Sequence, residues 1–249
     1  MLRKRLITVL TLNDGVLFRT KRFEPDYRYT LNFVDAWSVD EIILLDISRG
    51  ADPDRSPFLR VVEHFASRCF VPLAAGGGVR SMEDFRRLLA AGADKVVVNT
   101  AAVEEPALVT EAARLLGAQC VVVSIDARRG CDGGYEVYTH HGGKATGLEA
   151  AAWARQAQAL GAGEIFITSI DRDGALEGYE MALNRAVVDA VEVPVLVCGG
   201  AGQLKHFVDA FTVSGAAAVC TTNIYHFTET SIRSAKRYLR EAGVAVRDA

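Results

Sequence analysis

Apolar and polar positions follow one another in blocks along the chain. Short runs rich in β-branched residues alternate with longer amphipathic segments, and this order occurs eight times. The short runs are almost uninterrupted apolar segments, which is typical of strands buried on both faces and therefore of a parallel sheet. The predicted strands are residues 5–12, 41–47, 71–75, 95–99, 120–126, 164–169, 193–198 and 217–221.

The segments between the strands carry helix signals. Ser81 precedes the acids Glu83 and Asp84, and Glu104-Glu105-Pro106 is predicted to open another helix. Eight strands alternating with helices over 249 residues predict a single α/β domain, a (β/α)8 TIM barrel over residues 1–249. A doubly wound sheet is the alternative, but no glycine-rich dinucleotide motif follows the first strand.

An internal repeat favours the barrel. Residues 71–78 match residues 193–200 at a spacing of 122, and Glu41 and Glu164 are 123 apart. This shift is close to half the chain, so we expect two half-barrels. One insert breaks the pattern, residues 128–144, whose alternation predicts a small β-ribbon over the barrel mouth.

Composition narrows the function. The net charge is −3 and no basic run occurs, so we expect no nucleic-acid partner. No apolar stretch reaches about 18 residues, so we expect no membrane span. The N-terminus has charged residues followed by an apolar run, as a signal peptide does, but we interpret it as part of the mature protein. The five cysteines form no CxxC pair, which predicts a reducing cytoplasm without disulfides or structural zinc.

Two glycine-rich loops follow predicted strands and are typical of phosphate sites. Glycines let backbone N–H groups approach phosphate oxygens, and two such loops predict a ligand with two anionic ends. The alternative is that the glycines only relieve crowding at the rim. The first loop comprises Gly77 and Gly78 with Asn99 and Thr100, and the second comprises Gly200 and Gly202 with Thr222 and Asn223.

Carboxylates also end several strands. Asp126 ends the fifth, Asp46 the second, and Asp171 and Asp173 follow the sixth. A carboxylate there can be a general acid or base, or alternatively a rim salt bridge or helix cap. The half-barrel symmetry would place an acid at the end of strand one, but Thr11 stands there.

Charged residues also begin four strands, where they would form a ring at the bottom of the barrel or a solvated set of salt bridges. The histidines do not form a metal set: His140 and His141 lie in the predicted ribbon, and His64 and His206 look like helix-surface residues. We therefore expect no metal and no cofactor. The four charged residues are Arg5, Glu41, Lys95 and Glu164.

Several motifs together resemble the cyclase subunit of imidazole glycerol phosphate synthase, the HisF family, over nearly the whole chain. The isomerase of the same pathway shares the fold but fits less well. The motifs are Asp94-Lys95 with Asn99-Thr100-Ala101-Ala102, Val122-Val123-Ser124-Ile125-Asp126, Gly161-Ala162-Gly163-Glu164, Thr168-Ser169-Ile170-Asp171-Arg172-Asp173-Gly174 and Gly199-Gly200-Ala201-Gly202.

This resemblance implies a partner glutaminase below the barrel, whose ammonia enters through the four-residue charged gate. It also implies that the two loops, with Asp173 and Gly174, hold a phosphorylated substrate. Asp126 matches one of the family's two catalytic aspartates, and Arg19 stands where the family has a lysine in its mobile first loop.

Thr11 departs from the family pattern, because it occupies the position of the other catalytic aspartate. A divergent branch also lacks that aspartate and is similar to this chain at residues 5–10 and 138–142. That branch is the barrel partner of a glutaminase supplying ammonia for acetamidino groups on bacterial surface sugars, and we favour it. The alternatives are an orthodox histidine-pathway cyclase and a non-catalytic barrel that activates its glutaminase.

Overall fold

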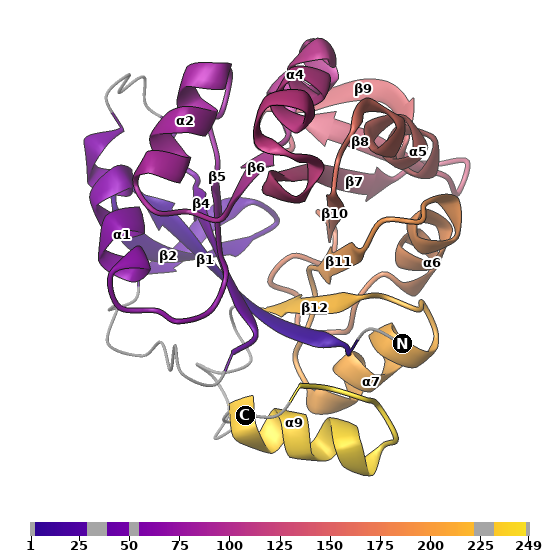
Figure 1. Cartoon of the computed structure of the whole chain (residues 1–249). Coiled ribbons are helices and arrows are strands. Elements are labelled where there is room, and N and C mark those ends of the chain that lie inside the picture. The colour runs from indigo at the N-terminus through magenta and orange to yellow at the C-terminus, as the bar shows by residue number, and fades with distance from the viewer. Residues whose placement is uncertain (1–2, 29–38, 50–54, 222–231, 248–249) are drawn as a thin grey trace.

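The computed structural model describes residues 3–28, 39–49, 55–221 and 232–247. Eight parallel strands close into a barrel, because the last pairs with the first through Arg5 opposite Ala218 and Thr8 opposite Thr221. The predicted (β/α)8 barrel is confirmed, and each predicted strand has a counterpart (Figure 1). In order around the barrel they are β1 (Arg5–Asn13), β4 (Glu41–Asp46), β5 (Leu73–Gly76), β6 (Lys95–Val98), β7 (Val121–Arg129), β10 (Glu164–Ser169), β11 (Val195–Cys198) and β12 (Ala218–Thr221).

Helices surround the barrel (Figure 1). Ser81 caps one of them, because its hydroxyl accepts the Asp84 N–H at 3.3 Å while the Asp84 carboxylate accepts the Ser81 N–H at 3.0 Å. Glu104 does not open a helix as predicted: it ends a short one, and the next begins after Pro106. Among the described residues no helix is long and apolar enough to cross a membrane. The helices are α1 (Ser56–Ala66), α2 (Met82–Ala90), α3 (Thr100–Glu104), α4 (Ala107–Leu116), η2 (Ala118–Cys120), α5 (Ala150–Leu160), α6 (Met181–Ala190), α7 (Leu204–Thr212) and α9 (Ile232–Glu241).

Two separate apolar cores hold this architecture. The larger one lies between the strands and the helices and includes the fully buried Phe85, Trp153 and Phe207. The smaller one fills the inside of the barrel, with Phe166 and Val97 among its members. Because inward side chains alternate along each strand, the barrel interior is apolar in its middle and leaves its two ends for polar groups.

The half-barrel repeat is visible in backbone conformation. Gly77 and Gly199 occupy the loops after β5 and β11 with φ of 88° and 90°, and the next residues, Gly78 and Gly200, have φ of 63° and 105°. Only glycine adopts such values without strain. The two glycine loops are therefore conformational counterparts.

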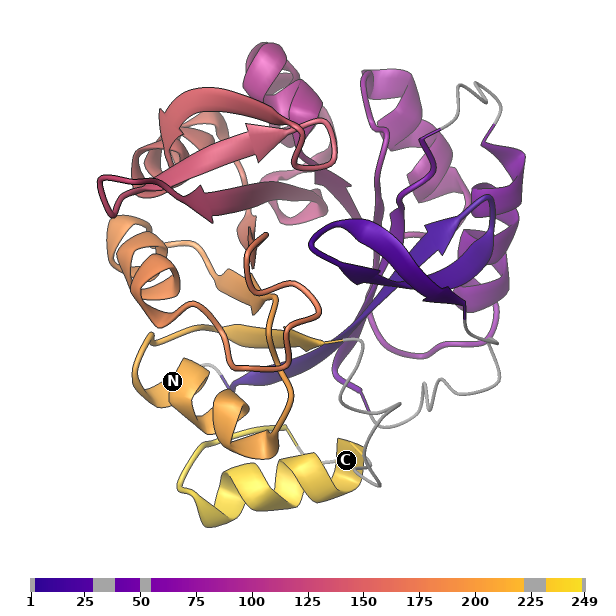
Figure 2. The ribbon, with the colours of Figure 1, turned by 180° about the vertical axis from the view of Figure 1, so that it is seen from behind.

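Two antiparallel additions extend strands β1 and β7 beyond the barrel. The predicted ribbon consists of β8 (Tyr135–Thr139) and β9 (Lys144–Glu149), which pair onto the end of β7. A second hairpin, β2 (Val16–Lys21) and β3 (Glu24–Arg28), pairs onto β1 and was not predicted. Figure 2 shows both additions at the same end of the barrel, in indigo and pink.

Candidate active site

The bottom of the barrel is closed by the four charged residues that the sequence placed there. Arg5 contacts Glu41 at 2.7 Å and Glu164 at 2.9 Å, and Lys95 contacts the same two carboxylates at 2.8 and 2.9 Å. Their side chains are only 2–16% exposed. Positive and negative groups therefore alternate around a closed ring. The ring is largely buried and is not a solvated set of surface salt bridges.

The other end of the barrel opens into a cavity of about 550 Å3. Loops from both halves of the barrel line it, and so do the hairpin and the ribbon. This is the end at which (β/α)8 barrels carry their active sites. The predicted site residues that line it are Thr11, Gly77, Gly78, Asn99, Thr100, Asp126 and Asp173, joined by Thr20, Phe23, His140, His141 and Cys198.

Asp126 lies in this cavity at the end of the barrel portion of β7. The Asn99 side-chain amide donates a hydrogen bond of 2.7 Å to its carboxylate. Burial, together with the nearby Asp173 carboxylate, raises the pKa of Asp126 to about 7, although the Asn99 bond opposes this. Asp126 is therefore divided between its acid and carboxylate forms near neutral pH, as a proton-transfer group must be.

Thr11 lines the same cavity from β1, but its hydroxyl binds the backbone of the β2–β3 hairpin. Its buried hydroxyl donates a hydrogen bond to the carbonyl oxygen of Phe18 on β2. That proton is therefore engaged with the backbone, and a threonine hydroxyl does not ionise at neutral pH. The end of β1 thus offers no carboxylate opposite Asp126.

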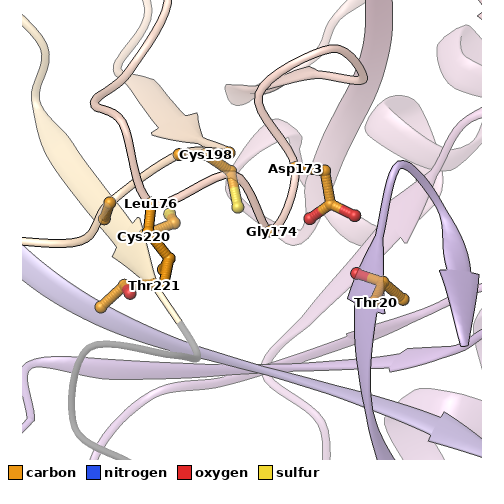
Figure 3. Close-up of a pocket in the computed structure, with 10 residues that line it drawn as sticks. Thr20, Asp173, Gly174, Leu176, Cys198, Cys220 and Thr221 are labelled. Atoms are coloured by element: carbon orange, nitrogen blue, oxygen red, sulfur yellow. The ribbon is translucent and has the colours of Figure 1, made fainter. Parts of the chain in front are cut away.

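Asp173 anchors the hairpin over the cavity. Its carboxylate accepts the Phe23 N–H at 3.1 Å and bonds the Thr20 hydroxyl, while its carbonyl accepts the Arg22 N–H at 3.1 Å. Figure 3 shows the carboxylate turned towards Thr20. Burial raises the pKa of Asp173, and the positive charge of Arg19 on β2 opposes that rise. The guanidinium of Arg19 therefore interacts electrostatically with the Asp173 carboxylate at the cavity mouth.

The other two candidate carboxylates belong to the rim. Asp171 does not line the cavity: it pairs with Arg128 at 3.7 Å and accepts the Arg129 N–H at 3.1 Å. Asp46 borders the cavity and pairs with Arg55 at 3.3 Å. For both residues the structure agrees with the alternative of a rim salt bridge.

The two glycines of the first glycine loop differ in the space around them. A side chain at Gly77 would collide with the carbonyl oxygen of Asp46, so this glycine is required by packing alone. A Cβ at Gly78 would meet only the Arg55 guanidinium, 3.6 Å away. Asn99 and Thr100 stand beside this loop, at the start of α3.

The second glycine loop borders a small pocket of about 30 Å3, drawn in Figure 3. This volume has room for about two water molecules. Gly174 and Gly200 line it, whereas Gly202 packs against the carbonyl of Leu176. The His206 ring accepts the Gly202 N–H at 3.1 Å, so it holds this loop and is not only a helix-surface residue. Thr222 and Asn223 lie outside the described residues.

The sequence did not single out several cavity residues. Thr20 and Phe23 come from the unpredicted hairpin, whose one signal was the turn sequence Asn13-Asp14-Gly15. Cys198 lines both the cavity and the small pocket, and burial raises the pKa of its thiol to about 12. That thiol is therefore a neutral wall residue at physiological pH.

A closed barrel with a cavity at the carboxyl ends of its strands, lined in part by Asp126 and Asp173, defines a (β/α)8 barrel protein with its cavity where such barrels carry their sites. The family model for histidine biosynthesis proteins matches residues 8–231, and the chain belongs to this family. Among the described residues no group of three or more His, Cys, Asp or Glu side chains is arranged to hold a metal ion.

Proposed function

We propose that this protein is the synthase subunit of a glutamine-dependent enzyme, a relative of the imidazole glycerol phosphate synthase cyclase. In this proposal it adds ammonia from a partner glutaminase to a phosphorylated substrate held in the cavity. The observation that carries the proposal is Asp126, a carboxyl group with a pKa of about 7 inside a cavity lined by the first glycine loop, with the second glycine loop at an adjoining small pocket that shares Thr20, Asp173 and Cys198 with it. Membership of the histidine biosynthesis family supports an enzyme of this barrel family.

The two ends of the barrel support a division of labour. The charged ring at the bottom is a polar entrance that ammonia could cross when one ion pair opens. Above it the inner core contains the small side chains of Ala74 and Ala218. The cavity at the top is where ammonia would meet the substrate.

Asp126 supplies the proton chemistry that such an addition needs. Attack of ammonia on a carbonyl carbon makes a bond to nitrogen and leaves a negative charge on oxygen. The protonated form of Asp126 can donate to that oxygen, and its carboxylate form can later accept a proton from nitrogen. General acid–base catalysis of this kind contributes about 10²–10⁴ in rate.

Thr11 favours an acceptor other than the histidine-pathway substrate. That reaction uses two carboxylates in the family that the chain resembles, and here the second position is a threonine bonded to the hairpin. We therefore infer a role in supplying ammonia for acetamidino groups of bacterial surface sugars.

The decisive experiment is a steady-state assay with ammonium chloride and the bisphosphate substrate of the histidine-pathway cyclase. We expect little product from the wild-type protein and a gain of about tenfold or more from Thr11→Asp. Robust wild-type turnover would instead make the protein an orthodox cyclase of histidine biosynthesis.

The partner is tested separately by size-exclusion chromatography with the glutaminase encoded nearest to this gene. We expect a heterodimer whose glutamine-dependent turnover falls in Lys95→Ala and Glu164→Ala. Unchanged binding and turnover in both variants would refute the gate. If glutaminase stimulation survives Asp126→Asn and no acceptor is consumed, the protein is a non-catalytic activator.

A further inference from the structure

The loop at the tip of the β8–β9 ribbon reaches into the cavity. Tyr138 pairs with Asp126, so the ribbon rises from the strand that carries the acid. Its loop, residues 140–143, then folds over the mouth, and a Cβ at Gly142 would lie 3.2 Å both from the Phe23 ring of the hairpin and from the Ile170 side chain after β10. His141 in this loop lines the same cavity as Thr11 and Asp126.

The ring of His141 interacts electrostatically with groups that belong to the β1 and β4 side of the mouth. The charges that act on its ring come from Arg49, His140, Asp46 and Glu24. Asp46 ends β4 beside Leu12 of β1, Arg49 follows β4, and Glu24 opens the second strand of the β1 hairpin. In the order of strands around the barrel, β1 lies opposite β7. The ribbon therefore carries an imidazole to the side where β1 ends in Thr11.

The two histidines of the loop are held differently. The His140 ring contacts Thr139 at 3.1 Å and Glu104 at 3.8 Å, and the backbone N–H of His140 donates to the Thr100 hydroxyl at 3.2 Å. No hydrogen bond or ion pair to another described residue fixes the ring of His141. Both histidines have a left-handed backbone conformation, with φ of 53° and 56°, which is uncommon for residues other than glycine. A ring held in this backbone position and left without a partner points to a role towards a ligand.

We propose that His141 is the catalytic proton-transfer group that faces Asp126 in place of the carboxylate missing at Thr11. This inference rests on the proposed function, because it assigns the second half of the same acid–base reaction. Partial burial and the charges of Arg49 and His140 lower the pKa of His141 from its ordinary 6.5, so the ring is neutral at pH 7 and can accept a proton. Asp126, with its raised pKa, is the matching donor.

The proton transfers balance over the reaction. Ammonia forms the bond to carbon, the added nitrogen loses one proton to His141, and the carbonyl oxygen takes one from Asp126. The resulting hydroxyl then leaves as water with the proton from His141, while the Asp126 carboxylate takes a second proton from nitrogen. The products are an imine and water, and both side chains return to their starting forms.

The carboxylates near the mouth do not fill this position. Glu104 and Glu105 line the cavity at the end of α3, which follows β6, a neighbour of β7, and Glu104 pairs with Lys144 at 3.0 Å. Asp173 follows β10, the neighbour of β7, so it lies on the side of Asp126, and its carboxylate anchors the hairpin. Asp171 lies outside the cavity and pairs with Arg128. Asp46 is bound to Arg55.

The test is a double-mutant cycle between His141→Asn and Thr11→Asp at pH 5.5–9, with the bisphosphate substrate varied, a fixed concentration of free ammonia, and enough enzyme to measure the low wild-type turnover. Asparagine is tolerated in the left-handed conformation, so the loop is retained while the titrating ring is removed. The matched control is His64→Asn, because His64 is an exposed histidine on α1 outside the cavity.

In the wild-type background we expect His141→Asn to lower kcat about tenfold or more with little change in KM. It should also abolish the rise of kcat with pH that has its midpoint below 6.5, because that rise reports the loss of a proton from the ring. In the Thr11→Asp background the same substitution should cost less than about twofold, since the restored carboxylate replaces the imidazole. His64→Asn should match the wild type.

Equal losses in both backgrounds would overturn the proposal, because they would show that His141 binds substrate or supports the loop. An unchanged pH profile, or the absence of His141-dependent turnover in the wild-type protein, would overturn it as well. The proposed function fails by a different result, namely no gain in Thr11→Asp alone or robust orthodox turnover. The two failures are therefore distinguishable.

Discussion

Replacing Asp126 by asparagine is expected to stabilise the protein while removing its activity. The pKa of this carboxyl is raised from its ordinary 3.8 to about 7, so the folded state binds its proton more tightly than the unfolded chain does. The contribution of Asp126 to stability should therefore be most favourable below pH 4, fall as the pH rises towards 7 and level off above it. Each tenfold change in the dissociation constant is worth about 1.4 kcal/mol, so the ionised Asp126 costs up to about 4 kcal/mol at pH 8.

Asparagine keeps the shape of the side chain and can still accept the hydrogen bond from Asn99 through its amide oxygen. It carries no charge to desolvate beside Asp173. Because asparagine also has to place its own N–H groups, we expect a gain of about 2–4 kcal/mol at pH 8 and almost none at pH 4. For a chain of this length the gain corresponds to an increase in Tm of about 4–16 °C.

Thermal and urea unfolding of the wild type and Asp126→Asn at pH 4 to 8 would measure this. The control is Asp189→Asn, an exposed carboxylate on α6 paired with Arg185, whose loss should change stability by less than about 1 kcal/mol. An Asp126→Asn variant that is destabilised, or equally affected at both ends of the pH range, would refute the raised pKa and the role derived from it.

Three further substitutions test a buried ion pair, the second glycine loop and the hydrogen bond to Asp126. Lys236→Ala should lower the free energy of unfolding by about 3–5 kcal/mol in urea, because it leaves the buried Asp40 carboxylate without an ion pair of 2.9 Å, whereas an effect below 1 kcal/mol would contradict this. Gly200→Ala should lower Tm and abolish the thermal shift given by inorganic phosphate, because φ of 105° disfavours alanine there; a retained shift would place phosphate elsewhere. Asn99→Ala should raise the pKa of Asp126, because the hydrogen bond that it removes stabilises the carboxylate form; the part of the pH–rate profile that reports Asp126 should then move to higher pH. An unchanged profile would show that Asn99 does not influence this pKa.

The barrel was predictable because its signals are local and repeated. Each buried strand is a short apolar run, and the repeat of residues 71–78 at 193–200 fixed the half-barrel register. The charged ring was predictable for the same reason: residues at equivalent positions of parallel strands lie in one layer, so Glu41 and Glu164 had to meet Lys95.

The roof of the cavity was not predictable from local patterns. The β2–β3 hairpin turns at Arg22 and Phe23, both with positive φ, where asparagine and glycine would have given the usual signal. The ribbon was predicted, but nothing in its sequence says which side of the mouth His141 reaches. Gly142 of its loop lies so close to Phe23, a residue more than a hundred positions earlier, and to Ile170 that an added Cβ would be 3.2 Å from each, and local patterns do not predict such proximity.

A carboxylate at position 11, opposite Asp126, is expected to raise cyclase activity and to lower the free energy of unfolding. The Thr11 hydroxyl donates to the Phe18 carbonyl, and an ionised aspartate in its place has no proton to give. Thr11→Asp would therefore set a negative charge against a carbonyl oxygen and should lower the free energy of unfolding by about 1–3 kcal/mol at pH 8. At pH 4 the protonated carboxyl can donate again, so the loss should be smaller there. Urea unfolding at both pH values decides this, and a Thr11→Asp protein as stable as the wild type at pH 8 would show that the hairpin does not depend on this bond. The expected gain in family activity and the expected loss of the hairpin contact thus have one cause, a carboxylate at the end of β1.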